Sequence, residues 1–201
     1  PKILITGPPG SGKTTLTTRV AQLIQDKHSH RFVCKGFYTQ EVRSANGQRI
    51  GFDVIDIANP SNRRQLARVV DNHRTVGPKV GKYSVDLAAF ESIAIPAMTV
   101  SPEEIQRLDE SRKELVIIID EIGKMEAFSD QFCDGVKRLF DSEVMSKSYR
   151  ILATVPVRRG VAVADEVRRL CGTDTEIHID YKNRDSMVDR VVNMLCETAV
   201  R

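Results

Sequence analysis

The stretch Gly7-Pro8-Pro9-Gly10-Ser11-Gly12-Lys13-Thr14 decides the fold expected of this 201-residue chain. Its pattern, G-x-x-x-x-G-K-[ST], is that of a phosphate-binding loop. The apolar run Ile3-Leu4-Ile5 before it predicts a buried strand over about residues 2–6. Apolar residues at helical spacing after it predict a helix from Lys13 to about Lys27. Strand, loop and helix in this order are the context that the motif requires.

The loop suits a triphosphate because glycines let the backbone N–H groups turn inward and the following helix presents its positive end. Lys13 is expected to reach the β- and γ-phosphates, and the Thr14 hydroxyl is expected to bind Mg²⁺. The residues predicted to bind the nucleotide are Gly7, Pro8, Pro9, Gly10, Ser11, Gly12, Lys13, Thr14, Thr15 and Arg184. Arg184 is included because it follows the last predicted strand, where P-loop proteins often meet the base.

Composition predicts one globular domain over residues 1–201. No apolar run of 18 residues is present, so we expect no membrane span, and the N-terminus leads directly into the first predicted strand, so we expect no targeting peptide. The four cysteines form no C-x-x-C pair, which favours reduced thiols in a cytoplasmic protein. A net charge of +3 without a dense basic cluster permits nucleic-acid binding but does not indicate it. We expect a monomer.

The remaining pattern predicts a mainly parallel α/β sheet flanked by helices. Strands are expected over about 115–119, 151–155 and 176–180, alternating with helices that begin near residues 101, 129, 161 and 183. Two extended stretches, 31–42 and 48–57, enclose Ser44-Ala45-Asn46-Gly47, whose Asn-Gly pair predicts an inserted antiparallel hairpin. Val80–Val85 is a further extended candidate, and the polar stretch 59–78 allows no assignment.

Asp120 and Glu121 follow the apolar run Leu115–Ile119, so they end a strand that is buried on both faces. A carboxylate at this position can hold Mg²⁺ beside Thr14. Glu121, directly after it, can orient and deprotonate an attacking water, a contribution of roughly 10²–10⁴-fold. Acidic residues are also common where a strand enters a loop, so the phosphate loop is what favours the functional interpretation. Asp120 is therefore the second predicted magnesium ligand, and Glu121 the predicted catalytic base.

Transfer of a γ-phosphate needs added positive charge in the transition state. Lys13 and Lys124 are the predicted catalytic cations. Other candidates are Lys82, Arg158, Arg168 and Arg184, any of which is also a plausible surface residue. Thr154, at the end of the next strand, either helps to position water or is simply a good strand former. No N/T-K-x-D guanine signature is present, so the sequence favours neither adenine nor guanine.

Several strings together resemble one family, that of the P-loop nucleoside-triphosphatases that include the cancer-related nucleoside-triphosphatase. The resemblance spans the chain in order, and its most specific part is Asp120-Glu121-Ile122-Gly123-Lys124-Met125-Glu126. The other strings are Gly7–Thr14, Gly36–Thr39, Arg49–Asp53, Val80–Tyr83, Thr154–Pro156 and Asn183–Asp185.

The resemblance implies a RecA-like core and slow, Mg²⁺-dependent hydrolysis of ATP, GTP, CTP and UTP to diphosphate and phosphate, with broad base tolerance. One alternative is a nucleotide or small-molecule kinase, although no arginine-rich lid is recognisable. The other is a nucleotide-gated, RNA-associated switch, which the modest positive charge permits.

Overall fold

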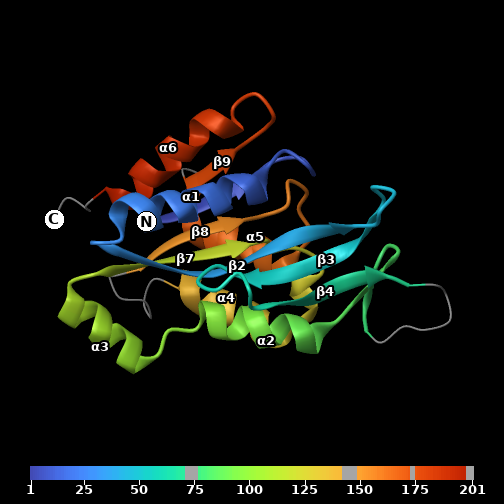
Figure 1. The fold of residues 1–201 in the computed structure, drawn as a ribbon, viewed down its shortest axis with the longest axis horizontal. Coiled ribbons are helices and arrows are strands. Elements are labelled where there is room, and N and C mark those ends of the chain that lie inside the picture. Colours follow the sequence, from blue (N-terminus) through green and yellow to red (C-terminus); the bar gives the residue numbers. More distant parts are fainter. Residues whose placement is uncertain (71–76, 142–148, 173–174, 198–201) are drawn as a thin grey trace.

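The positions of the strands explain how distant parts of the sequence meet. The computed structural model describes residues 1–70, 77–141, 149–172 and 175–197 (Figure 1). The strands are β1 (Lys2–Thr6), β2 (Phe32–Arg43), β3 (Arg49–Asp56), β4 (Arg63–Val69), β5 (Lys79–Val80), β6 (Tyr83–Val85), β7 (Glu114–Asp120), β8 (Tyr149–Thr154) and β9 (Glu176–His178). The helices are α1 (Lys13–His28), α2 (Leu87–Met98), α3 (Pro102–Ser111), α4 (Asp130–Phe140), α5 (Ala162–Cys171) and α6 (Arg184–Cys196), with a short 3₁₀ turn η1 (Glu126–Phe128).

The described strands form one sheet in the order β5-β6-β4-β3-β2-β7-β8-β1-β9. Neighbours from β2 to β9 pair in parallel, as predicted for the core. Strand β8 lies between β1 and β7. The phosphate loop after β1 and Asp120 at the end of β7 therefore lie at the same carboxyl edge of the sheet, where ligands bind in such folds.

The antiparallel portion is larger than the single hairpin expected from the sequence. The Asn-Gly turn is confirmed, with the Gly47 N–H donating to Ser44 O at 2.9 Å between β2 and β3. Strand β2, however, also pairs in parallel with β7, so it belongs to the core. Strands β3, β4, β6 and β5 extend the sheet beyond it in antiparallel pairings. We call these four strands the antiparallel wing.

Helices cover the sheet on both faces (Figure 1). One buried cluster joins α1 and α6 to the sheet, and the other joins α2, α4 and α5 to the opposite face. Strand β7 contributes to both, since Val116 and Ile118 lie in the first cluster and Ile117 and Ile119 in the second. All four are fully buried. The predicted double-sided burial of this strand is confirmed.

Helix boundaries follow their capping residues. Ser101 accepts a hydrogen bond from the Glu104 N–H at 3.1 Å, which confirms the predicted start of α3.

Helix α2 was not predicted, and it contains Pro96. Strand β4 lies within the unassigned stretch 59–78, of which 71–76 fall outside the described residues. None of the described helices is long and apolar enough to cross a membrane.

Candidate functional site

The phosphate loop is held in shape by its glycines. Gly10 and Gly12 have φ angles of +78° and +97°, a region that side chains rarely tolerate. Gly7 packs so tightly that an added Cβ would lie 2.3 Å from the Ile179 carbonyl oxygen after β9. The Ser11 N–H donates to Pro8 O at 3.1 Å and closes the turn. These contacts fix a curved loop directly before helix α1, as a phosphate cradle requires.

The side chains at the start of α1 point toward this loop and toward β7. Lys13 Nζ donates to the carbonyl oxygens of Gly7 and Pro8, at 3.1 and 3.5 Å. Thr14 is half-buried, and its hydroxyl interacts with the Asp120 carboxylate. The hydroxyls of Thr6 and Ser11 are buried without a hydrogen-bond partner among the described residues. The loop therefore brings a positive charge and unused hydroxyl groups to one place.

Asp120 is completely buried at the end of β7. Its Oδ1 accepts a hydrogen bond from the Thr154 hydroxyl at 2.7 Å, whereas Oδ2 has no hydrogen-bond partner among the described residues. Burial raises the pKa of Asp120, and the Thr14 and Thr154 hydroxyls and the Lys13 charge oppose that rise. A buried carboxylate with one free oxygen is costly unless a cation or donor completes it.

Two further carboxyl groups follow Asp120, Glu121 on the loop after β7 and Glu126 at the start of η1. A cis peptide bond joins Asp120 to Glu121. Burial raises the pKa of Glu121; the charge of Lys13 opposes this and that of Asp120 adds to it. Burial, together with the charges of Glu121 and Asp120, raises the pKa of Glu126 to about 8. Sequence reasoning missed Glu126, although it ends the most specific string of the chain.

These residues fit a magnesium ion of the kind that also binds a nucleotide. No group of three His, Cys, Asp or Glu side chains in the described part of the chain is arranged to hold a metal by itself. Mg²⁺ in nucleotide sites is usually bound through one or two protein oxygens, with phosphate and water oxygens supplying the rest. The free Oδ2 of Asp120 and the neighbouring Thr14 hydroxyl are suitable oxygen ligands.

The loop between β9 and α6 lies against the phosphate loop from outside. An added Cβ on Gly12 would lie 2.7 Å from Arg184 Cδ, and one on Gly10 would lie 3.0 Å from the Tyr181 hydroxyl. Thr15 is exposed and lines a small hollow with Arg19 and Arg184. Arg184 therefore lies beside the phosphate loop, and its role in nucleotide binding stays a prediction. Tyr181 was missed, and its only sequence signal is an aromatic residue inside a polar turn.

The remaining candidate cations are dispersed. Arg168 is buried, and it donates hydrogen bonds to the Glu176 carboxylate and to Pro156 O. Its charge is therefore compensated by Glu176. Lys82 is exposed in the antiparallel wing beside the Tyr83 ring. Lys124 and Arg158 are exposed on the loops after β7 and β8 and make no ion pair with any described residue. The structure thus brings Lys13, Thr14, Asp120 and Glu121 together and leaves Lys124 at the rim.

Comparisons with known proteins give the family and the fold to which this chain is similar. A family model described as NTPase matches residues 2–192. The mouse cancer-related nucleoside-triphosphatase homolog is 34% identical over 195 residues, covering 94% of each chain. The crystal structure of THEP1 from Aquifex aeolicus superimposes with a TM-score of 0.72 at 32% identity, covering 98% of this chain and 100% of that one. The solution structure of a human cancer-related nucleoside triphosphatase gives a TM-score of 0.74 at 31% identity, covering 98% of each.

Proposed function

This chain belongs to the NTPase family, and we propose that it hydrolyses nucleoside 5′-triphosphates to diphosphate and phosphate, with Mg²⁺ as cofactor. The observation that carries this proposal is the buried Asp120 carboxylate, whose Oδ2 is unpartnered beside Thr14 at the edge that holds the phosphate loop. A phosphate-bound cation would complete this arrangement.

In this proposal the backbone N–H groups of residues 7–14 and the Lys13 ammonium bind the phosphates. Lys13 would exchange its contacts with Gly7 O and Pro8 O for phosphate oxygens. Thr14 and Asp120 would hold Mg²⁺. When bound, that ion would neutralise charge on the β- and γ-phosphates. Positioning and electrostatics, not covalent chemistry, would supply most of the acceleration.

Glu121 would orient a water molecule toward the γ-phosphate and accept its proton. Its raised pKa supports this role, because a carboxylate with a higher pKa is a stronger base. The nearby charge of Lys13 lowers the pKa and so favours the ionised form of Glu121, which is the form that can accept a proton. Lys124, exposed three residues later, would add positive charge in the transition state.

We further propose broad tolerance of the base, with ATP, GTP, CTP and UTP all accepted, and slow turnover. Residues 1–201 would act as one domain, since one continuous sheet joins the described strands. The protein would be a monomer. Cys34, Cys133, Cys171 and Cys196 are all unpaired, which supports a reducing compartment such as the cytoplasm.

The test is inorganic phosphate release from each of the four triphosphates, with and without Mg²⁺, for the parent and for Glu121→Gln. We expect release from all four that requires Mg²⁺. Glu121→Gln should bind nucleotide normally and lose about 10²–10⁴-fold in turnover. Glu110→Gln, on the exposed side of α3, serves as the matched control. Undiminished hydrolysis in Glu121→Gln would remove the assignment of the base, and no release from any triphosphate would contradict the proposed function.

A further inference from the structure

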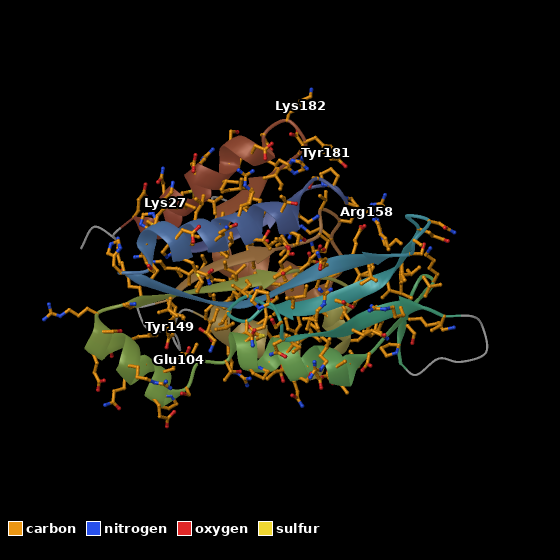
Figure 2. The ribbon with its side chains drawn as sticks, viewed as in Figure 1. Lys27, Glu104, Tyr149, Arg158, Tyr181 and Lys182 are labelled. Carbon is orange, nitrogen blue, oxygen red and sulfur yellow. The ribbon has the colours of Figure 1, made fainter. Side chains whose placement is uncertain are left out.

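Tyr181 is unusually exposed for an aromatic residue. It lies in the turn between β9 and α6, and 67% of its surface is accessible, the largest fraction for any large apolar side chain among the described residues. Figure 2 shows Tyr181 and Lys182 on this turn, with Arg158 from the loop after β8 on the same side of the molecule. An aromatic ring left in water at the carboxyl edge of a sheet is a candidate ligand contact.

The turn that carries Tyr181 is fixed by side-chain hydrogen bonds. Asp180 Oδ1 accepts from the backbone N–H groups of Lys182 and Asn183, at 2.8 and 3.0 Å. Asn183 in turn accepts from the Asp180 N–H at 2.9 Å and donates to His178 O at 3.1 Å. These bonds hold both ends of the turn. Tyr181 is therefore exposed at a defined position.

That position is next to the phosphate loop. The Tyr181 hydroxyl lies 3.0 Å from where a Cβ on Gly10 would be. The Arg184 guanidinium lies 5.6 Å from the centre of the Tyr181 ring, while its aliphatic part packs against Gly12. Arg184 Nε is buried without a hydrogen-bond partner among the described residues, and the Asp185 carboxylate lies 4.0 Å from it. Tyr181 and Arg184 together form an aromatic and cationic surface at the outer side of the loop.

We propose that the Tyr181 ring stacks on the nucleobase of the bound nucleotide, with Arg184 supporting it. The inference rests on the proposed function, in that it takes the ligand to be a nucleoside phosphate. Ribose is the only spacer between the phosphates and the base, so the base must lie close to the loop. Stacking is tolerant of base identity because every base has a π-face. It therefore accounts for recognition of a base without a guanine-specific signature.

The experiment compares the binding of ADP, GDP, CDP and UDP with that of inorganic pyrophosphate, all with Mg²⁺, by calorimetry. Tyr181→Ala should weaken the binding of all four diphosphates by about 5- to 100-fold and leave pyrophosphate binding unchanged. The purines should lose more than the pyrimidines, because their rings offer more stacking area. Tyr181→Phe keeps the ring and should bind like the parent.

If Tyr181→Ala weakened the binding of ADP and of pyrophosphate equally, the proposal would be overturned, because the ring would then support the phosphate loop or contact the phosphates. Unchanged ADP binding would overturn it too. Because diphosphate binding does not require hydrolysis, these results are independent of phosphate release, and a parent that binds ADP but releases no phosphate would contradict only the proposed function.

A spectroscopic readout tests the contact directly. The chain contains no tryptophan, so Tyr181→Trp introduces a single tryptophan at the proposed contact, and its emission can be excited selectively over that of the remaining tyrosines. We expect saturating ADP or GDP to quench its emission and saturating pyrophosphate to leave it unchanged. Emission unaffected by bound ADP would show that the ring does not meet the base.

Discussion

The Thr154 hydroxyl donates a hydrogen bond of 2.7 Å to Asp120 Oδ1, between the last residues of the neighbouring strands β8 and β7. Both side chains are fully buried. This bond occupies one carboxylate oxygen and leaves Oδ2 unpartnered beside Thr14. Thr154 therefore orients Asp120, the proposed magnesium ligand. The sequence had suggested only that Thr154 positions water or is a good strand former.

Thr154→Val should impair use of Mg²⁺ while preserving the fold. Valine keeps the shape of threonine but cannot donate a hydrogen bond, so Asp120 loses its orienting partner. Loss of such outer contacts typically costs about 10- to 100-fold in metal affinity or activity. A magnesium titration of phosphate release would measure the effect. Thr154→Ser restores the donor and should recover most of the loss; equal behaviour of the two variants would contradict the orienting role.

Gly12→Ala should abolish phosphate binding by distorting the loop. Its φ of +97° disfavours any side chain, and the added Cβ would lie 2.7 Å from Arg184 Cδ. Gly47→Ala is the matched control, because Gly47 also has a positive φ, +75°, but faces open space. We expect Gly47→Ala to lose about 1 kcal/mol of stability and bind pyrophosphate normally. Calorimetry would measure pyrophosphate binding by both variants, and urea unfolding would measure their stability. Normal pyrophosphate binding by Gly12→Ala would refute this prediction.

Arg150→Met should destabilise the protein strongly. Arg150 is only 5% exposed, and it donates to Glu114 at 2.8 Å and to the carbonyl oxygens of Leu195 and Glu197 at the end of α6. The change leaves the buried Leu195 carbonyl oxygen without this donor, which costs about 1–3 kcal/mol, and removes the packing of a buried side chain, while Glu114 keeps its ion pair with Arg31 at 2.8 Å. Urea unfolding measures this cost. Arg64→Met, at an exposed position in β4, should change stability by less than about 0.5 kcal/mol.

Glu126→Gln should alter how stability depends on pH. Burial, with the charges of Glu121 and Asp120, raises the pKa of Glu126 from 4.5 to about 8. Between these values the folded protein holds a proton that the unfolded chain has lost. The contribution of Glu126 to stability is therefore full below about pH 4.5 and is lost as pH rises toward 8.

Glutamine mimics the protonated acid and does not titrate, so the free energy of unfolding of Glu126→Gln should gain on that of the parent as pH rises from about 5 to about 8. Urea unfolding of both proteins across this range provides the comparison. A difference between them that does not change with pH would show that Glu126 titrates normally.

The sequence alone determined the parts of this protein that depend on local rules. The phosphate loop needs glycines at fixed positions and a strand and helix beside it, and Gly7–Thr14 shows all of these. Strand β7 was predictable because burial on both faces requires an unbroken apolar run, and α3 because Ser101 caps it.

Only the tertiary structure decided which distant side chains meet. Helix α2 contains a proline and strand β4 is mostly polar, so packing against the sheet, not local pattern, fixes them. Thr154 reaches Asp120 only because β8 lies between β1 and β7 in a particular register. Tyr181 meets the phosphate loop only because β9 pairs with β1. Strand order and register are set by long-range burial, which no short stretch of sequence encodes.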